Sequence, residues 1–374
     1  MSWSFMSKAR PRTTALAAGV AAFGLVLAGC GGGEGDDASG EETYELTFAS
    51  WATPGSSNEA VQDRWMEMID EATDGRITFE VSMAGSLCDS DEIPECVRDG
   101  RADVGQTIAD YAPDLFPQTT VVSIPFLTEN TQAMNRALWA LTTEHEGAAQ
   151  LWQDNNLKMI SHWPAGRLLL GSQEPVESID DVADLTWRMA GPYTQYAVDT
   201  VGGSNVALTA PETYEAVERD VVDAVGFPID GLVSFQLKDI LPQWTDPGIG
   251  QYTTVGMWMN YDVYESLPED LKAAVDEVNN EFNAGPASET FSEITLKQCD
   301  VILEDIGQID EWDPSETERW REAVGTDLEE RWISDAEADG LTDAEQYLQM
   351  YKDKLEEIGD DVDEDPSLVC SGRA

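Results

Sequence analysis

Residues 175–188 read PVESIDDVADLTWR, which predicts a short helix followed by a strand. Ser178 precedes the helical residues 179–184 and is the expected N-cap, because a Ser side chain can accept a hydrogen bond from the first turn. Residues 185–187 have the apolar, β-branched and aromatic character that strands favour, and the run ends in Arg188. A cation among apolar residues costs free energy unless an anion meets it. Arg188 is therefore expected either to form an internal ion pair or to hold a ligand carboxylate with its planar fork of donors.

The same alternation of strands and helices runs through most of the chain. Strands are expected at 45–50, 76–82, 157–161, 168–172 and 221–227, with 102–105 leading into another, and helices at 58–73, 91–99, 192–202 and 212–218. From residue 268 to 306 the helical pattern is almost unbroken, although Pro286 is expected to kink it near Gly285. Further helices are expected over 315–336 and 342–358. Strands and helices mixed at this rhythm predict an α/β fold.

Composition indicates a globular and very acidic protein. The 374 residues include 21 Lys and Arg against 73 Asp and Glu, and 42% are hydrophobic, with 12 Trp. This charge argues against nucleic acid and anionic membrane surfaces as partners. It also destabilises a compact fold by self-repulsion, which a screening length of about 3 Å at 1 M salt would largely remove. We therefore hypothesise a salt-rich habitat.

The N-terminus has the order of an export signal. Three basic residues lie within residues 8–12, and residues 13–29 then carry no charge and end in Leu-Ala-Gly before Cys30. This apolar run is short for a spanning helix, and a signal-anchor helix is the alternative. Residues 30–43 are expected to form a flexible tether. Without the leader, 18 basic residues face 73 acidic ones, a net charge near −55.

Four cysteines remain after Cys30: Cys88, Cys96, Cys299 and Cys370. An even number in an exported chain suggests disulfides. Cys88 and Cys96 are close enough in sequence for a local bridge, and Cys299–Cys370 would then join the C-terminal tail to a helix. A zinc site is the weaker alternative, because no Cys-x2-Cys spacing occurs and the chain has only two histidines.

The sequence offers little for catalysis. Neither histidine has a Ser or Cys partner in a recognised motif, and the glycines at 31–33 belong to the tether rather than to a phosphate loop. Residues 335–340 resemble half of an EF-hand, but Glu337 and Gln346 depart from the ligand pattern. We therefore expect no enzyme activity, no cofactor and no metal.

Several motifs occur in an order that is specific, although each alone is weak. They are Ser56–Glu59, Gly75–Val81 followed by Ala84–Leu87, Val97–Gly105, Ile124–Leu127, Pro175–Arg188, Thr213–Val217 with Val221–Asp223, Met259–Asn260 and Leu267–Leu271. In this order the chain, from Tyr44 to Ile358, resembles the extracytoplasmic solute-binding proteins of tripartite ATP-independent periplasmic (TRAP) transporters, the DctP-like family, in a lipoprotein form. The lipidated residue would be Cys30, since Leu27–Cys30 resembles a lipobox.

The resemblance implies a two-domain, periplasmic-binding-protein-like clamp with a long helix that spans both domains. Domain I would comprise residues 44–164 and 253–300, and domain II residues 165–252 with the C-terminal helices of 301–358. Residues 359–374 would be an acidic, solvated tail. The implied partners are a small organic acid and the small and large TRAP membrane subunits, with the protein lipid-anchored in the periplasm or on the outer face of the cell membrane. A binding component of an ABC importer or of a sensor system is the alternative.

In the family, an Arg at the position of Arg188 holds the ligand carboxylate by two contacts, and a second Arg, here Arg167, often lies beside it. The chain departs from polar-lined members elsewhere: Phe227 replaces an Asn, Ile108 and Tyr111 stand where an acid and an Arg occur, and Trp51 falls near another Asn. The full set of expected ligand-binding residues is Arg188, Arg167, Trp51, Ile108, Tyr111, Trp163, Phe227 and Trp258. This aromatic set predicts a monocarboxylate with an apolar or aromatic body.

Overall fold

The computed structural model describes residues 42–359 and 361–372. The predicted signal peptide, Cys30 and most of the tether lie outside these residues. In the part described, no helix is both long and apolar enough to cross a membrane.

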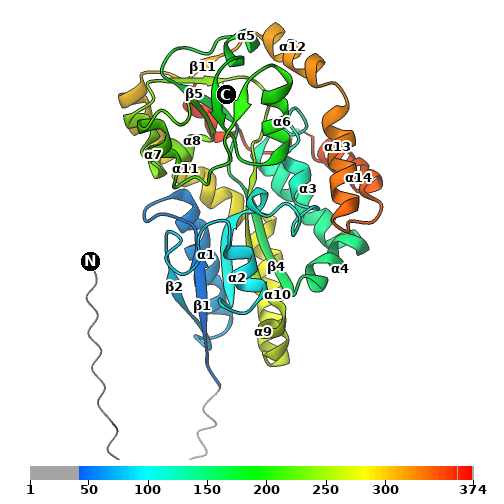
Figure 1. Cartoon of the computed structure of the whole chain (residues 1–374). Helices are drawn as coiled ribbons and strands as arrows, with labels where there is room; N and C mark the ends of the chain where they lie inside the picture. Colours follow the sequence, from blue (N-terminus) through cyan, green and yellow to red (C-terminus); the bar gives the residue numbers. More distant parts are fainter. Residues whose placement is uncertain (1–41, 360, 373–374) are drawn as a thin grey trace, which may run out of the picture. The chain divides into compact units, whose positions relative to one another are not determined.

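Two mixed sheets organise the fold (Figure 1). The five-stranded sheet has the order β2-β1-β3-β10-β4 and consists of β1 (Tyr44–Ser50), β2 (Ile77–Ser82), β3 (Val104–Ile108), β4 (Leu157–Pro164) and β10 (Thr254–Asn260). The six-stranded sheet has the order β11-β9-β5-β8-β6-β7 and consists of β5 (Leu169–Ser172), β6 (Thr186–Arg188), β7 (Ser204–Asn205), β8 (Ala224–Phe227), β9 (Gln243–Asp246) and β11 (Asp310–Glu311). The chain therefore crosses between the sheets after β4, again after β9, and a third time between β10 and β11.

Helices surround both sheets, as the α/β prediction requires. They are α1 (Ser57–Ala72), α2 (Ile93–Arg98), α3 (Thr131–Glu144), α4 (Glu146–Asp154), α5 (Ile179–Val182), α6 (Pro192–Thr200), α7 (Thr213–Glu218), α8 (Ile229–Ser234), α9 (Tyr261–Ser266), α10 (Glu269–Ala284), α11 (Pro286–Ile306), α12 (Pro314–Val324), α13 (Asp327–Ala338), α14 (Ala344–Ile358) and α15 (Pro366–Cys370). Short 3-10 turns are η1 (Ala109–Tyr111), η2 (Thr120–Ser123) and η3 (Leu237–Asp239). The fold class expected from the sequence is confirmed.

The segment 175–188 forms the predicted short helix and strand, α5 and β6. Ser178 is the N-cap of α5, and its backbone N–H donates to the carboxylate of Asp181 at 2.9 Å. Strand β6 then pairs in parallel with β8, with Arg188 opposite Val225. Arg188 therefore stands at the C-terminal end of a strand inside the six-stranded sheet.

The long helix predicted over 268–306 is two helices, α10 and α11, separated at Gly285. Gly285 has φ −170° and ψ −55°, and Pro286 has no N–H with which to continue the helical hydrogen-bond ladder. The expected kink is thus a full break. Helix α11 contacts α1, which follows a strand of the five-stranded sheet, and α8, which follows a strand of the six-stranded one, so α11 is the part that reaches both.

The C-terminal residues contradict the expectation of a solvated tail. The structure joins Cys88 to Cys96, and Cys299 of α11 to Cys370 of α15. Asp365 is only 3% exposed and accepts hydrogen bonds from Gln251 Nε2, at 2.9 Å, and from Thr131 Oγ1. Asp361, Asp363 and Glu364 are exposed, as expected of a solvated tail, but the expectation does not hold from Asp365 to Ser367. An acidic run does not reveal that one of its carboxylates meets buried donors from other segments of the fold.

Candidate functional site

Arg188 is 1% exposed, and its guanidinium is surrounded by neutral oxygens. Nε donates to the carbonyl of Leu208 at 3.1 Å, and Nη2 to the hydroxyl of Tyr111 at 3.2 Å. Nη1 lies 3.4 Å from both the Gly226 carbonyl and the Tyr252 hydroxyl. Among the described residues, no carboxylate lies within 4.0 Å of this guanidinium. The internal ion pair considered from the sequence therefore does not form there.

Both phenols beside Arg188 are neutral partners. Burial raises the pKa of Tyr252 to about 12, although the nearby Arg188 opposes that shift. Burial likewise raises the pKa of Tyr111, again with Arg188 acting in the opposite direction. Phe227 covers the guanidinium, with the Arg188 Cζ 4.4 Å from the ring centroid, a cation–π contact. The positive charge of Arg188 is thus surrounded by carbonyl and hydroxyl dipoles and by the Phe227 ring. A buried charge without a counter-ion favours the binding of an anionic ligand.

A small cavity opens at Arg188. Its lining residues are Trp51, Asn58, Ile108, Ala165, Arg188, Ala210, Phe227, Pro228, Asp230, Gly231, Phe235 and Tyr252. Its volume is about 20 Å³, room for about one water molecule. The cavity brings together four of the predicted residues, Arg188, Trp51, Ile108 and Phe227, and Tyr111 touches the guanidinium from beside it.

Arg167 lies elsewhere. Its Nε donates to Asp246 at 2.6 Å and its Nη1 to Glu129 at 2.7 Å, and it is not among the residues that line the cavity. It also forms an isolated β-bridge with Gln251, which joins the segment after β4 to the segment after β9. The structure gives Arg167 the ion-pair role that the sequence analysis had considered for Arg188.

Two of the predicted tryptophans also lie outside the cavity wall. Trp163 is buried behind it and donates from Nε1 to the side-chain oxygen of Asn58 at 2.9 Å, which orients that lining residue. Trp258 stacks on Phe116, with ring centroids 4.3 Å apart and planes 8° from parallel, in the core beside the five-stranded sheet. Both tryptophans lie on strands whose two faces are buried, so their neighbours in sequence are buried as well. The sequence alone therefore does not show which face of the sheet each side chain points to.

Sequence analysis missed several lining residues, above all Asn58, Asp230, Phe235 and Tyr252. One signal was present: residues 226–233 read GFPIDGLV, in which Asp230 is the sole charge in an apolar run directly after a strand. A lone acid in an apolar run can be interpreted in the same way as a lone cation. Its burial costs free energy unless a protein group or a ligand pairs with it.

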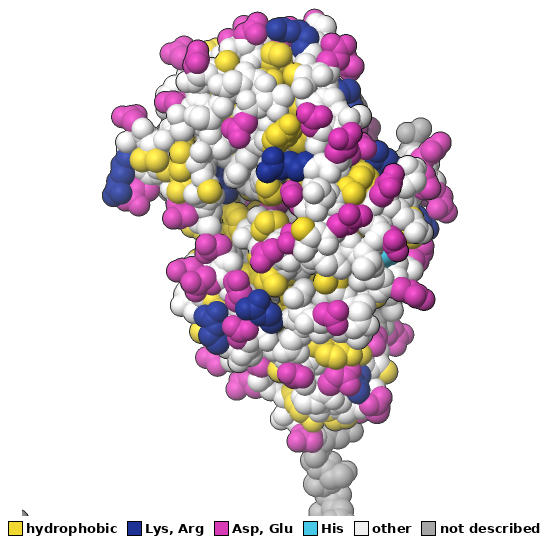
Figure 2. Space-filling model, turned by 45° about the vertical axis from the view of Figure 1, so that its right-hand side comes forward, with side chains coloured by type: hydrophobic (Ala, Val, Ile, Leu, Met, Phe, Trp, Pro, Cys, Tyr) yellow, Lys and Arg dark blue, Asp and Glu magenta, His cyan; other side chains and the backbone are white. Residues whose placement is uncertain are grey.

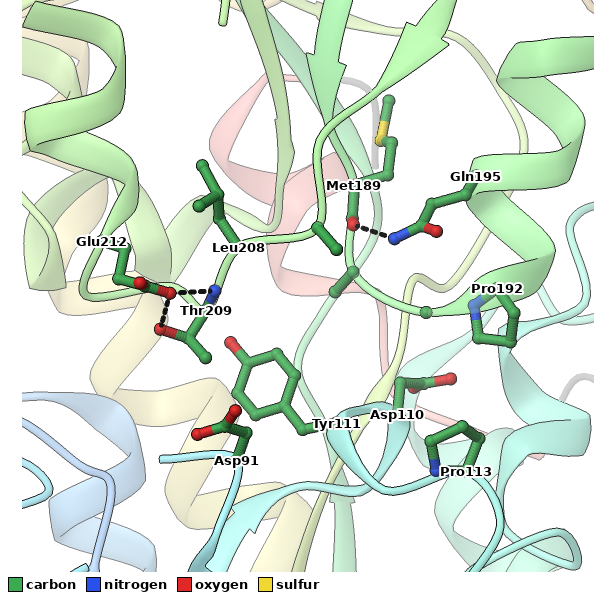
Figure 3. A pocket seen from close by; sticks show the side chains of 13 residues that line it. Asp91, Asp110, Tyr111, Pro113, Met189, Pro192, Gln195, Leu208, Thr209 and Glu212 are labelled. Atoms are coloured by element: carbon green, nitrogen blue, oxygen red, sulfur yellow. Dashed lines mark hydrogen bonds between the residues drawn. The ribbon is translucent and has the colours of Figure 1, made fainter. Parts of the chain in front are cut away.

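A second, wider cavity of about 460 Å³ adjoins the first (Figure 3). Tyr111, whose hydroxyl reaches Arg188 and Ala210 N, projects into this cavity. Its wall carries the carboxylates of Asp91, Asp110 and Glu212 and no Lys or Arg. Burial raises the pKa of Asp110 to about 6, while hydrogen bonds from Thr253 and Ser123 oppose the shift. This acidic cavity is unsuited to an organic anion, so the Arg188 cavity is the better anion site.

Two mixed sheets between which the chain crosses three times, with a small cavity built on a buried cation, are consistent with a solute-binding protein of the clamp type. Residues 48–335 match the family described as bacterial extracellular solute-binding protein, family 7 (DctP), and the chain belongs to this family. The resemblance to the DctP-like family, stated from the motifs, is thereby confirmed.

Relatives agree with this assignment. The ectoine-binding periplasmic protein TeaA of Halomonas elongata is 24% identical over 204 residues, which cover 54% of this chain and 59% of TeaA. The ectoine/5-hydroxyectoine-binding periplasmic protein UehA of Ruegeria pomeroyi is 22% identical over 252 residues, 66% of this chain and 70% of UehA. The chain thus matches about three fifths of the length of TeaA.

Solved structures share the fold over nearly their whole length. A TRAP solute-binding protein from Rhodoferax ferrireducens, in complex with copurified benzoate, superposes with a TM-score of 0.76 at 20% identity and covers 84% of this chain and 98% of its own. A TRAP periplasmic solute-binding protein from Bordetella bronchiseptica with bound (R)- and (S)-mandelate gives a TM-score of 0.74 at 25% identity, over 84% and 99%.

Proposed function

We propose that this chain is an extracytoplasmic solute-binding protein that captures a small organic carboxylate at Arg188 and delivers it to a TRAP-type secondary transporter. The observation that carries the proposal is the buried Arg188 guanidinium, which has hydrogen-bonded neutral partners but no carboxylate within 4.0 Å in the described part of the chain. A planar fork of this kind binds a carboxylate by two parallel hydrogen bonds. The bound carboxylate would supply the negative charge that Arg188 does not receive from the protein.

The walls of the cavity select the body of the ligand. Trp51, Ile108, Phe227 and Phe235 offer apolar surface, and the Phe227 and Phe235 rings lie 5.8 Å apart. Such walls contribute burial and stacking but few hydrogen bonds. We therefore expect a compact organic acid rather than a polyhydroxylated sugar acid. The benzoate and mandelate held by the two structures above are acids of this shape.

Two lobes would close on the ligand. Lobe I would consist of residues 44–164 and 253–300, and lobe II of residues 165–252 with the C-terminal helices of 301–358. A cavity of about 20 Å³ cannot admit an organic acid, so the lobes must part for entry. The crossing segments between β4 and β5 and between β9 and β10 contain glycines at positive φ, Gly166 at 116° and Gly250 at 89°, which permit backbone conformations that other residues avoid. Capture and release need no catalytic step.

The proposal includes attachment to the cell. Acylation of Cys30 would anchor the folded part through residues 30–43, in the periplasm or on the outer face of the membrane. The small and large TRAP membrane subunits would receive the closed, loaded form. An ABC importer or a sensor would use the same clamp, and reconstitution separates them: uptake should follow a sodium gradient through TRAP subunits without ATP.

A melting-temperature screen tests the binding function. Protein lacking residues 1–42 is screened in molar salt against benzoate, mandelate, aliphatic monocarboxylates and ectoine, beside the Arg188→Ala variant. A ligand that binds only the native state raises its stability by RT ln(1 + [L]/Kd). An increase that disappears in the variant supports the proposal. An increase that survives the substitution, or no increase with any acid, would contradict it.

A further inference from the structure

We propose that the ligand is a zwitterion, in which a cationic nitrogen faces Asp230 while the carboxylate binds Arg188. This inference rests on the proposed function and names the ligand class more narrowly. It follows from a second buried charge in the same cavity, from the aromatic wall beside it, and from the charge of the whole protein.

Asp230 mirrors the situation of Arg188. It is 2% exposed and lines the cavity. Its carboxylate accepts hydrogen bonds from Ser57 N at 3.2 Å, from Asn58 Nδ2 at 3.3 Å and from Ser234 Oγ at 3.0 Å, all of them neutral donors. No Lys, Arg or His of the described chain lies within 4.0 Å of it. The cavity therefore contains one cation and one anion that do not pair with each other.

A simple monocarboxylate would match only one of these charges. It would neutralise Arg188, but its apolar end would leave Asp230 with neutral donors only. A buried carboxylate that has no positive counter-charge is unfavourable in a protein interior. A zwitterion supplies a partner for each buried charge, so closure of the lobes leaves neither one uncompensated.

The aromatic wall also suits a cation. Trp51 and Phe235 line the cavity together with Asp230, and their ring centroids are 5.7 Å apart. Aromatic faces attract ammonium and amidinium groups, most strongly when water is excluded. The indole N–H of Trp51 is buried and has no hydrogen-bond partner within the described chain, which leaves a donor for a ligand oxygen. An aromatic wall with one carboxylate is thus equipped for a cationic nitrogen.

The net charge of the protein favours the same ligand. The formal charge is −52, and acidic side chains are spread over the face seen in Figure 2. Such a field slows the approach of an anion, whereas a zwitterion has no net charge on which the field can act at long range. At low ionic strength a protein with this surface therefore collects zwitterions without the penalty that a simple anion meets, and molar salt screens this difference.

Asp230 has a second possible role, which the experiment must separate. It belongs to α8 and accepts from the first turn of α1, so it also links elements that adjoin different sheets. Loss of such a link would weaken closure on every ligand equally. Loss of a partner for the ligand nitrogen would weaken binding of zwitterions alone.

Matched ligands that differ in one charged atom provide the test. Glycine betaine and 3,3-dimethylbutyrate differ only in nitrogen or carbon at the quaternary centre, and pipecolate and cyclohexanecarboxylate differ similarly in a ring. Dissociation constants are measured by calorimetry for the wild type, Asp230→Asn, Arg188→Met and, as a matched control, Asp110→Asn, which alters a buried carboxylate outside the Arg188 cavity. Each preference is a ratio within one protein, so a general loss of stability cancels.

We expect the wild type to bind the zwitterion of at least one pair tenfold or more tightly than its carbon isostere. Asp230→Asn should remove most of that preference, Asp110→Asn should keep it, and Arg188→Met should weaken binding of both members by about 30-fold or more. If the carbon isosteres bind as well as the zwitterions and depend on Arg188, the zwitterion inference is overturned while the carboxylate clamp stands. If no member of either pair binds while an acid of the melting-temperature screen does, the zwitterion inference is overturned and the carboxylate clamp stands. If Arg188→Met weakens binding less than about tenfold, the proposed function fails and this inference with it.

Discussion

Replacing each buried arginine by methionine should separate ligand binding from stability. Methionine keeps much of the length of arginine and none of its charge or donors. Arg188 contacts neutral oxygens and lines the cavity. Arg167 lies outside the cavity lining and forms ion pairs with Asp246 and Glu129. The two variants therefore make opposite predictions, although the sequence expectation had placed both residues on the ligand.

Arg188→Met should mainly reduce affinity. Truncating one partner of a buried, hydrogen-bonded charge pair costs about 2–5 kcal/mol of binding free energy. At about 1.4 kcal/mol per factor of ten, the dissociation constant should rise from about 30-fold to several thousand-fold. The ligand-free protein should change less than the Arg167 variant does, because the substitution leaves no carboxylate uncompensated.

Arg167→Met should mainly reduce stability. Asp246 is 0% exposed at its side chain, and breaking a buried ion pair costs about 3–5 kcal/mol. With about 2.1 cal/mol/K of unfolding entropy per residue over about 330 residues, this loss lowers the melting temperature by about 4–7 °C. The dissociation constant of the retained ligand should stay within about threefold.

Calorimetry with the best ligand and melting curves without ligand supply the two measurements. The reasoning is refuted if Arg167→Met weakens binding as much as Arg188→Met while leaving the melting temperature unchanged. That result would put both arginines on the ligand and would make the Asp246 and Glu129 contacts incidental.

Three further predictions concern stability. Burial lowers the pKa of His162 to about 3, so its neutral form contributes stability that is complete above the unfolded pKa of about 6.5 and is lost as pH falls toward 3. His162→Gln should therefore flatten the decline in unfolding free energy between pH 7 and 4 by about 3 kcal/mol, measured by urea denaturation, and an unchanged decline would assign it to other groups. Raising KCl from 0.1 to 2 M should raise the melting temperature because salt screens the self-repulsion of the acidic surface, and equal stability in both would end the salt-habitat hypothesis. Cys370→Ser should cost about 4 kcal/mol and Cys96→Ser about 2.5, because the bridges close sequence separations of 71 and 8 residues, and denaturant curves showing the reverse order would contradict the loop-entropy account.

Local patterns were sufficient for most of the secondary structure. The strand expected at 45–50 is β1 at Tyr44–Ser50, and the helix expected at 58–73 is α1 at Ser57–Ala72, because each buries a regularly spaced face. The break at Gly285 was not predictable from periodicity, since apolar positions continue on both sides and proline is well tolerated in the first turn of a new helix.

The site was only partly accessible to the sequence. Arg188 could be singled out because it is a rare cation at the end of an apolar strand. Arg167 looked equivalent in the sequence. In the fold, however, Asp246, 79 positions away in the chain, lies beside Arg167 and forms an ion pair with it. Asp230 went unnoticed because its importance depends on sharing a cavity with Arg188, which no local pattern reveals.

The sequence by itself determined the α/β class, the even set of cysteines and the excess of acid, and it led to the expectation of an export signal, because each is a property of composition or of short-range spacing. Only the tertiary structure decided which arginine is left without a carboxylate and which acid shares its cavity. The physical reason is that the free energy of a buried charge depends on the groups within a few ångströms of it, and in this fold those groups come from segments far apart in the chain.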